Sequence, residues 1–166
     1  MARAYLGLGS NLGDRRSLLA AAIEALDWGD VRVVQRSSIY ETEPVGGPAD
    51  QPWFLNMVIG VDTSLSPHQL WERCAGVEIA LGRAHGREER WGPRTIDVDV
   101  LLHGTSSVND EELVIPHPRM HERAFVLLPL AEIAPDAGIG DLGSVGEILT
   151  TLSSRWTVRK TLEASS

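Results

Sequence analysis

The sequence predicts a single α+β domain with a mostly antiparallel sheet and helices packed on it. Stretches in which apolar and polar residues alternate are interleaved with stretches in which apolar residues recur every three or four positions. Two alternating stretches, within residues 31–62, follow one another without an intervening helix, as antiparallel neighbours do. The length of 166 residues suits one domain, so we expect residues 1–166 to fold as a unit.

The first half of the chain is expected to hold three strands and one helix. The first strand runs into a glycine-bearing turn, and Asn11 or Asp14 is placed to cap the helix that follows. A stretch rich in proline and glycine argues against regular structure between the second and third strands. In chain order, we expect a strand at 4–9, a helix that ends before Gly29, a strand-like stretch at 31–41, a loop at 43–52 and a strand at 54–62.

The second half is expected to alternate helices with one long strand. Ser66-Pro67-His68-Gln69 has the pattern of a capping box with proline at the first helical position, and Gly82 should end that helix. Pro129 should kink or divide a later helix. After Gly82 we expect a loop at 83–94, a strand that runs to Gly104, a polar connection at 105–112, a helical stretch at 121–133, a short helix capped by Ser144 and Glu147, and a terminal strand at 156–162.

Composition and charge exclude several classes of function. A formal net charge of −8 argues against attraction to nucleic acid or to an anionic membrane. No apolar stretch reaches the roughly 18 residues that a membrane-spanning helix needs, and Cys74 alone cannot form a disulfide framework. Lys160 is the only lysine and follows no glycine-rich loop, which excludes a Walker-type phosphate loop. We expect a cytoplasmic, monomeric enzyme that acts on small molecules.

The most informative motif is a pair of aspartates in an apolar, β-branched run. Side chains alternate along a strand, so Asp97 and Asp99 share one face while Ile96, Val98 and Val100 share the other. Two residues of strand rise separate the two Cα atoms by roughly 6.6 Å, which suits one cation or a close pair. Unpaired carboxylates at this spacing repel each other. For the pair alone, a solvated strand face with polar residues outward is the simpler interpretation; the arginine-rich segment before it favours a Mg²⁺ site and a polyphosphate substrate.

Basic residues precede the aspartates in a segment broken by glycine and proline. Four arginines follow one another at intervals of three or four residues, which on a helix would form a solvated stripe: Arg83, Arg87, Arg90 and Arg94. Because glycine and proline argue against a continuous helix, we predict a lid that folds arginines over a polyphosphate. Trp91 supports this interpretation, since an indole in a polar loop needs somewhere to bury.

Other candidates also have an ordinary structural interpretation. Phe54 and Asn56 share one strand face and offer a stacking surface beside an amide, although a core aromatic and an incidental asparagine explain them more simply. His117, held between two prolines, suits a fixed hydrogen bond to phosphate or a surface role. The glycines from Gly7 to Gly13 have the spacing G-x-G-x-x-x-G, which departs from the dinucleotide fingerprint and predicts tight turns instead.

These blocks together resemble the family of 6-hydroxymethyl-7,8-dihydropterin pyrophosphokinases. Residues 90–101, RWGPRTIDVDVL, are similar to the family signature, and blocks at 5–11, 38–56 and 114–135 agree in order and spacing. The resemblance covers about residues 4–136. It implies a ferredoxin-like α+β fold and, in folate biosynthesis, transfer of the β,γ-pyrophosphoryl group of ATP to the pterin hydroxymethyl group with release of AMP.

The resemblance also implies the site residues. Asp97 and Asp99 would hold two Mg²⁺ ions that bridge the triphosphate, and Asp97 is the candidate general base. Arg83, Trp91 and Arg94 join them as expected catalytic residues. The expected ATP-binding residues are Glu78, Arg83, Arg94, His117 and Arg123. The expected pterin-binding residues are Thr42, Pro44, Val45, Phe54, Asn56 and Phe125. Two loops, at 44–53 and 83–93, would close over the substrates.

Some positions depart from the family pattern. Pro118 stands where a tyrosine is common, which removes one expected phosphate contact. Phe54 also replaces a frequent tyrosine, so stacking is kept while a hydroxyl is lost. His85 and Arg87 are both open as the second cationic contact of the arginine loop.

Two other functions fit parts of the pattern. A different metal-dependent transferase, for nucleotidyl or glycosyl groups, would explain Asp97 and Asp99 but not the coincident blocks around Phe54 and His117. A regulatory module on a ferredoxin-like scaffold would bind a small ligand without Mg²⁺ and would leave the paired aspartates without a role.

Overall fold

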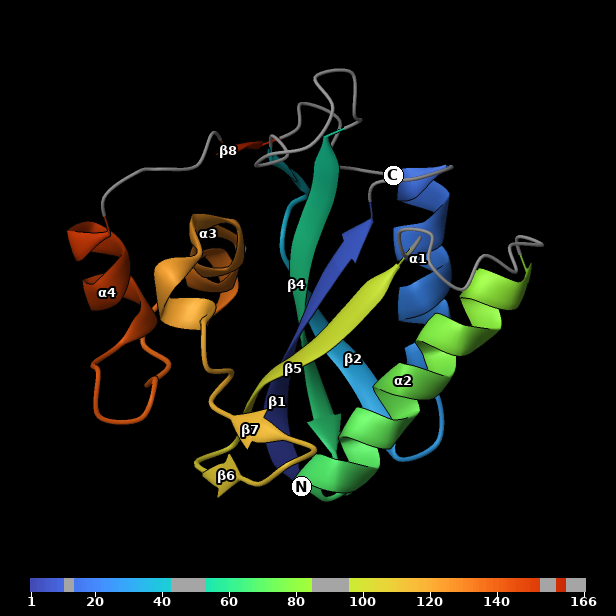
Figure 1. The fold of residues 1–166 in the computed structure, drawn as a ribbon, viewed down its shortest axis with the longest axis horizontal. Coiled ribbons are helices and arrows are strands. Elements are labelled where there is room, and N and C mark those ends of the chain that lie inside the picture. Colours follow the sequence, from blue (N-terminus) through green and yellow to red (C-terminus); the bar gives the residue numbers. More distant parts are fainter. Residues whose placement is uncertain (11–13, 43–52, 85–95, 153–157, 161–166) are drawn as a thin grey trace.

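The computed structural model describes residues 1–10, 14–42, 53–84, 96–152 and 158–160, without the side chains of residues 83, 84, 158 and 159. Within these ranges the chain forms an antiparallel sheet covered by helices on both faces (Figure 1). The strands of this sheet are β1 (Ala2–Ser10), β2 (Val31–Arg36), β3 (Tyr40–Thr42), β4 (Phe54–Thr63), β5 (Asp97–His103) and β8 (Val158–Lys160). A separate two-stranded hairpin is formed by β6 (Val108–Asn109) and β7 (Val114–Ile115).

The strand order identifies the fold class. The strands lie in the order β5-β1-β4-β3-β8, and β2 also pairs with β4, so β2 and β3 lie one after the other along the same side of β4. Helices α1 (Arg15–Leu26) and α2 (Pro67–Ala84) make the two crossovers. With β2 and β3 taken together as the one stretch that pairs with β4, this gives the β-α-β-β-α-β pattern of ferredoxin-like domains. The predicted α+β class and its antiparallel sheet are therefore confirmed.

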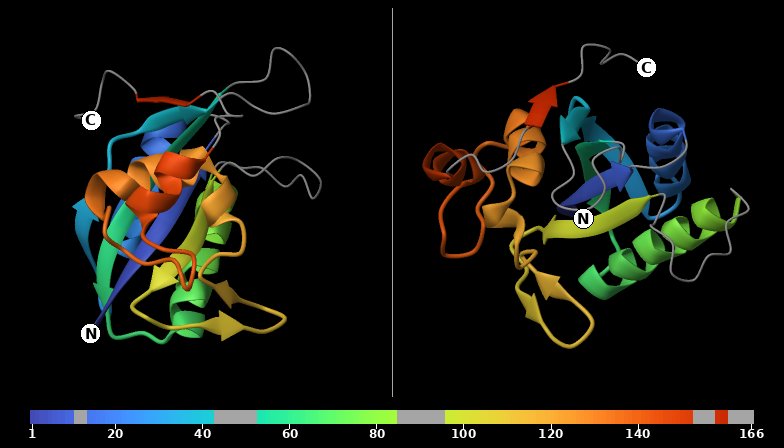
Figure 2. Two further views of the ribbon diagram at one scale, coloured as in Figure 1. Left: turned by 90° about the vertical axis from the view of Figure 1, so that its left-hand side faces the viewer. Right: turned by 45° about the horizontal axis from the view of Figure 1, so that its top comes forward.

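The two faces of the sheet have separate apolar cores. Helices α1 and α2 pack on one face, where Leu18 and Leu70 are fully buried together with the inward residues of β4 and β5. On the other face lie η1 (Met120–Glu122) and α3 (Ala124–Ile133), with α4 (Val145–Thr151) packed behind α3 (Figure 2). Val58 and Leu127 belong to this second core. The alternation predicted for residues 54–62 is thus confirmed: successive side chains of β4 point to opposite faces of the sheet and enter different cores.

The predicted helix caps are present. Asp14 accepts from the Ser17 backbone N–H at 3.2 Å at the start of α1. At the start of α2, the Ser66 hydroxyl accepts from the Gln69 N–H at 3.2 Å, and the Gln69 side chain accepts from the Ser66 N–H at 2.9 Å. Ser144 forms the same reciprocal box at the start of α4.

The helix end predicted at Gly82 and the division of a helix predicted at Pro129 are wrong. Gly82 lies inside α2, which continues to Ala84; a Cβ there would meet nothing within 4 Å, and one glycine costs a helix only about 1 kcal/mol. Pro129 lies inside α3 and does not divide it. The break comes earlier, at Arg123 between η1 and α3, because burial of Leu127 and Leu130 on either side of Pro129 holds that helix together.

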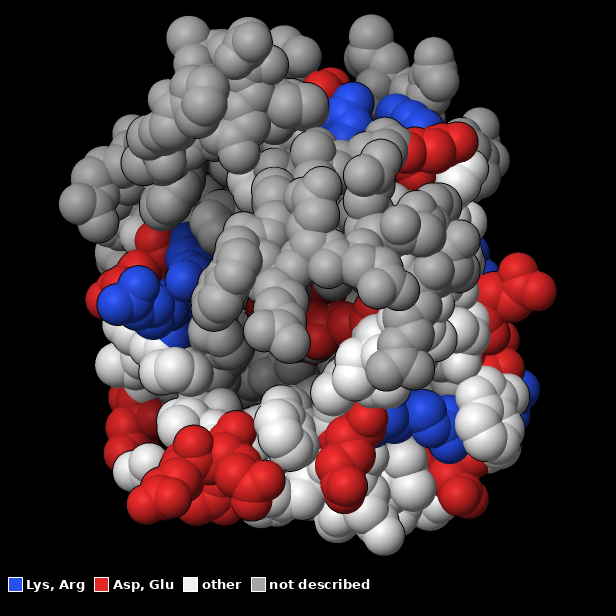
Figure 3. Space-filling view, turned by 45° about the vertical axis from the view of Figure 1, so that its right-hand side comes forward, with Lys and Arg blue, Asp and Glu red and all other residues white. Residues whose placement is uncertain are grey.

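Charged side chains are dispersed on the face of the molecule that Figure 3 shows. In that view, Asp and Glu side chains form several separate groups with Arg and Lys side chains between them. None of the helices in the described ranges is long and apolar enough to cross a membrane.

Glu132, near the end of α3, joins that helix to β3. Its carboxylate accepts hydrogen bonds from the Ser38 N–H at 3.0 Å, the Ser38 hydroxyl at 2.9 Å and the Tyr40 hydroxyl at 2.8 Å. Burial raises the pKa of Glu132, but these hydrogen bonds outweigh it and leave the pKa below its ordinary value. Burial, followed by the neighbouring Glu132 carboxylate, raises the pKa of Tyr40 to about 12, so the phenol remains a donor at neutral pH.

Stability should depend on pH through Glu132. A carboxyl whose pKa is lower in the folded state stabilises that state above its ordinary pKa of about 4.3, and this contribution is lost as the pH falls through the lower value. We expect Glu132→Gln to reduce the free energy of unfolding by about 1–3 kcal/mol near neutral pH and to flatten its acid dependence. Urea denaturation across the acid range measures both effects. Glu24→Gln, at an exposed position of α1, is the control. Identical pH profiles for the wild type and Glu132→Gln would contradict the prediction.

Candidate active site

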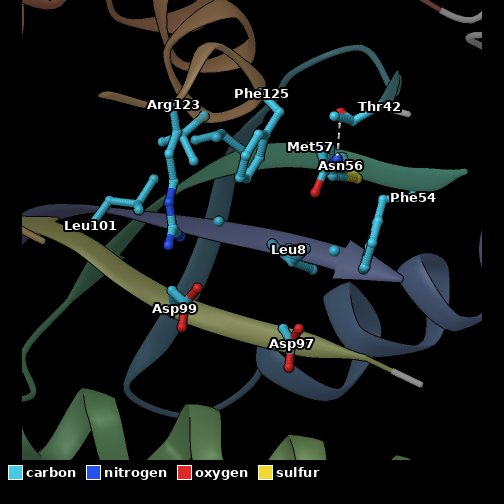
Figure 4. A pocket seen from close by; sticks show the side chains of 14 residues that line it. Leu8, Thr42, Phe54, Asn56, Met57, Asp97, Asp99, Leu101, Arg123 and Phe125 are labelled. Atoms are coloured by element: carbon cyan, nitrogen blue, oxygen red, sulfur yellow. Dashed lines mark hydrogen bonds between the residues drawn. The ribbon is translucent and has the colours of Figure 1, made fainter. Parts of the chain in front are cut away.

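A cavity of about 340 Å³ opens on the sheet face that carries α3, next to the start of that helix (Figure 4). A volume of this size suits a small-molecule ligand. It is lined by residues from β1, β3, β4, β5 and the start of α3: Gly7, Leu8, Gly9, Thr42, Phe54, Asn56, Met57, Val58, Asp97, Asp99, Leu101, Arg123, Phe125 and Val126.

The aspartate pair forms the acidic side of this cavity. Asp97 and Asp99 both line it, and Figure 4 shows both carboxylates on the same side of β5. Val98 and Val100 point the other way and are 4% and 3% exposed in the core beneath α1 and α2. The predicted alternation along this strand is confirmed. The same alternation that places valines in the core presents both carboxylates to the cavity.

Glycines of β1 form the floor between the acidic side and the rest of the cavity. Gly9 lies opposite Asn56 of β4 and opposite Asp97 of β5, and Gly7 lies opposite Asp99. Neighbouring strands are about 4.8 Å apart, so the backbones of Asn56 and Asp97 are roughly 10 Å apart across Gly9. A Cβ on Gly9 would lie 2.9 Å from Asn56 Oδ1. Gly7 and Gly9 lie within β1 and line the cavity, which confirms the strand predicted at 4–9 and contradicts the tight turns predicted from the glycine spacing.

Aromatic and amide groups form the opposite side. Phe54 reaches the cavity from the start of β4 and Phe125 from α3, and the amide of Asn56 lies between the two rings in Figure 4. Asn56 Nδ2 donates to Thr42 Oγ1 at 2.9 Å, and both residues are buried. This bond fixes the Asn56 side chain at the wall. The structure thus brings together the four described residues that were predicted to bind the pterin.

Two cationic candidates approach the aspartates from the start of α3 and the segment before it. Arg123 lines the cavity and points toward Asp99 in Figure 4, and its guanidinium carbon is 5.6 Å from the Phe125 ring centroid. Burial lowers the pKa of His117; the Asp99 carboxylate opposes this, while Arg123 and Arg119 add to it. The Arg119 N–H donates to His117 Nδ1 at 3.3 Å, which assigns the proton of the neutral ring to Nε2.

Among the described site residues that the sequence predicts, Glu78 and His117 do not line the cavity, and Glu78 lies on the other side of β5. Glu78 belongs to α2. Its Oε2 accepts a hydrogen bond from the Val98 backbone N–H at 2.7 Å. Glu78 therefore contacts the strand that bears the aspartates.

Several predicted residues lie outside the described part of the structure. They are Pro44, Val45, Trp91 and Arg94, together with both predicted loop closures and the candidate contacts His85 and Arg87. The backbone of Arg83 lies in the last turn of α2, but its side chain is outside the description as well.

The donor set at the cavity fits a divalent ion that is shared with a ligand. Carboxylate oxygens are the ligands that Mg²⁺ prefers, and Mg²⁺ is commonly held by one or two carboxylates plus substrate phosphates. Among the described residues, no three His, Cys, Asp or Glu side chains come close enough to hold a metal alone. Asp97 and Asp99 would therefore hold Mg²⁺ together with oxygens that the ligand supplies.

Comparison with known proteins identifies the family. The profile of the 7,8-dihydro-6-hydroxymethylpterin-pyrophosphokinase family matches residues 5–135. This chain belongs to that family. It is 57% identical over 141 residues to the 2-amino-4-hydroxy-6-hydroxymethyldihydropteridine pyrophosphokinase of Methylorubrum extorquens, covering 84% of this chain and 87% of the relative. The Bacillus subtilis protein of the same name is 52% identical over 131 residues, covering 78% of this chain and 77% of the relative.

Solved structures support the ferredoxin-like fold of this family member. The Plasmodium falciparum HPPK-DHPS triple mutant with STZ-DHP superposes with a TM-score of 0.70 at 14% identity, over 90% of this chain and 43% of the solved chain. This chain thus spans less than half the length of that solved protein. The folic acid synthesis protein fol1 of Pneumocystis carinii is similarly longer: 43% identity extends over 132 residues, which is 80% of this chain and 17% of fol1.

The residues that sequence reasoning missed are those without reactive side chains. Gly7 and Gly9 are two positions apart in β1, so the signal was available: period-two spacing places both on one face of a strand. Leu101 and Val126 also line the site of this pyrophosphokinase family member. Their residue types and spacing do not distinguish them from apolar core residues, so the sequence gives no signal for them.

Gly9 should tolerate no side chain. We expect Gly9→Ala to lower the free energy of unfolding by about 1–3 kcal/mol, since the new methyl group would push against Asn56 Oδ1 and the strand backbone. The side-chain amide signals of Asn56 should shift in NMR spectra. Gly76→Ala is the matched control, because a Cβ at Gly76 in α2 meets nothing within 4 Å and should stabilise the helix by up to about 1 kcal/mol. Unchanged Asn56 amide signals in Gly9→Ala would show that the floor is looser than described.

Proposed function

We propose that the cavity is the active site of a pyrophosphokinase and that its two sides hold different substrates. As a member of its family, the chain is an ATP-dependent diphosphotransferase of folate biosynthesis. It transfers the β,γ-pyrophosphoryl group of ATP to 6-hydroxymethyl-7,8-dihydropterin and yields AMP and the pterin diphosphate. Residues 1–166 are proposed to act as a single domain.

One observation carries the assignment of substrates to sides. Asn56, Gly9 and Asp97 are neighbours across three strands, so an amide wall and a carboxylate wall face one another over a glycine floor. A flat heterocycle stacked between Phe54 and Phe125 and read by Asn56 would lie on Gly9. Its hydroxymethyl group would then point toward the aspartates. Thr42 would support this pocket by fixing Asn56.

The acidic side is proposed to receive the triphosphate. Asp97 and Asp99 would share two Mg²⁺ ions with the phosphate oxygens, and bound Mg²⁺ supplies positive charge against the negative charge of the polyphosphate. Arg123 enters the same cavity and can pair with phosphate in a bidentate manner. His117 is suited to donate from Nε2 as a neutral ring. Arg83, Trp91, Arg94, Pro44 and Val45 keep the roles that the family resemblance implies, as proposals.

These residues are proposed to act mainly by positioning the two substrates for in-line transfer. The pterin hydroxyl oxygen forms a bond to the β-phosphorus, and the bond from that phosphorus to the oxygen leading to the α-phosphorus breaks. AMP leaves with that oxygen, and the hydroxyl proton passes to a base, for which Asp97 is the candidate. Catalysis then comes from holding the two substrates in line and from stabilising charge on the transferred group.

The cellular location, oligomeric state and partners of the enzyme are also part of the proposal. We place the enzyme in the cytoplasm, where ATP is available, as a monomer with ATP and the pterin as its partners. The net charge of −8 supports the proposal that nucleic acids and membranes are not partners. Light scattering on a sizing column tests the monomer.

The reaction should depend on both aspartates. We expect ³¹P NMR of the protein with ATP, Mg²⁺ and the pterin to show AMP and a pterin diphosphate, and neither product without the pterin. Asp97→Ala and Asp99→Ala should each lower kcat by at least about 1,000-fold, since each removes several kcal/mol of charge stabilisation. Asp141→Ala, at an exposed aspartate away from the cavity, should leave turnover unchanged. Formation of ADP would contradict pyrophosphoryl transfer, and near-normal kcat in either cavity variant would contradict the metal assignment.

The aromatic side should govern pterin affinity. Phe54→Ala removes one stacking surface, which by analogy with base stacking on aromatic residues should weaken pterin binding by about 1–3 kcal/mol, or roughly 5- to 150-fold in Kd. Phe54→Tyr keeps the ring and should bind within a few-fold of the wild type. Titration calorimetry with the pterin, and separately with a non-hydrolysable ATP analogue, separates the two sides. Equal losses for both ligands in Phe54→Ala would contradict the division of the cavity.

A further inference from the structure

Strand β5 lies at the edge of the sheet, and one of its outward N–H groups is bound by a carboxylate. Among the described strands, β5 pairs within this sheet with β1. On its other side, Glu78 Oε2 accepts from the Val98 N–H at 2.7 Å, across from α2. A carboxylate acceptor makes a shorter and stronger bond to a backbone N–H than a neutral acceptor does.

The bond is made at the residue between the two aspartates. Val98 is held twice: its side chain is 4% exposed in the core, and its N–H is bound by Glu78. The backbone on both sides of that peptide carries Asp97 and Asp99, whose carboxylates face the cavity. Any rotation of the Val98 peptide would therefore change the direction of both carboxylates relative to one another.

The Glu78 carboxylate brings a negative charge as well as a hydrogen-bond acceptor to the Val98 peptide. A glutamine oxygen would satisfy the Val98 N–H without a third negative charge beside Asp97 and Asp99. This charge also acts in the core beneath β5, at Cys74. Burial is the main cause that raises the pKa of the Cys74 thiol to about 12, and the negative charges of Glu78 and Asp99 add to it. The two carboxylates thus act on the same point in the core beneath β5.

We propose that Glu78 is a positioning residue, whose carboxylate fixes the backbone between Asp97 and Asp99 and whose charge strengthens divalent-cation binding at the cavity. This inference rests on the proposed function for the identity of the cation site. It gives Glu78 a task other than contact with the nucleotide. Outer residues that orient metal ligands typically change metal affinity or activity by about 10- to 100-fold when they are removed.

Two variants separate the hydrogen bond from the charge. Glu78→Ala removes both, whereas Glu78→Gln keeps an acceptor and removes the charge. Glu72→Ala is the matched control, because Glu72 is an exposed glutamate on the same helix. The first readout is the Val98 amide in ¹H–¹⁵N spectra and its hydrogen exchange. The second is the Kd of Mg²⁺ in the presence of α,β-methylene-ATP, whose α–β bridge the enzyme cannot break.

The expected pattern differs between the variants. In Glu78→Ala, the Val98 amide proton should move upfield and exchange faster, and the Mg²⁺ Kd should rise by about 10- to 100-fold. In Glu78→Gln, the amide should stay close to its wild-type position while the Mg²⁺ Kd still rises. Glu72→Ala should change neither, and pterin affinity should be unchanged in all three.

Other results would overturn the inference. An unchanged Val98 amide in Glu78→Ala, with weaker binding of the ATP analogue even without Mg²⁺, would assign Glu78 to direct nucleotide contact. A wild-type Mg²⁺ Kd in Glu78→Gln would remove the role of its charge. Failure of the wild type to form AMP would overturn the proposed function instead, and the Val98 amide would still decide whether Glu78 holds the strand.

Discussion

The site depends on the register of three neighbouring strands. Because β1 pairs with β4 on one side and β5 on the other, Asn56, Gly9 and Asp97 are aligned in one row. The middle position carries no side chain, so the two outer side chains face a shared space. Any larger residue at Gly9 would close that space against Asn56. The separation of an amide wall from a carboxylate wall is thus set by backbone pairing and not by flexible side chains.

The same sheet also separates the site from the main core. Residues of β4 and β5 that point away from the cavity are buried beneath α1 and α2, where Val98 and Ile59 are nearly or fully inaccessible. The face toward α3 has its own core around Leu127 and Leu130 and leaves the cavity beside it. Glu132 connects α3 to β3 and the segment before it through hydrogen bonds with Ser38 and Tyr40. The helix that supplies Arg123 and Phe125 is therefore anchored at its far end.

Sequence periodicity predicted the features that depend on local geometry. The common face of Asp97 and Asp99, the two faces of β4 and the caps at Ser66 and Ser144 follow from spacing over a few residues. Gly82 and Pro129 were misjudged because packing along α2 and α3 outweighs the local preference of one residue. The contact between Glu78 and Val98 joins residues 20 positions apart on different elements, and only the tertiary fold reveals it.

The alternation along β5 has a consequence for how this chain can change over evolutionary time. In residues 96–100, core and cavity positions follow one another singly, so a one-residue insertion or deletion within this strand would exchange the two sets. Carboxylates would then point into an apolar core and valines into the cavity, which would damage folding and chemistry together. Length variation should therefore accumulate in the connections that flank β5, while the strand itself can vary by substitution alone.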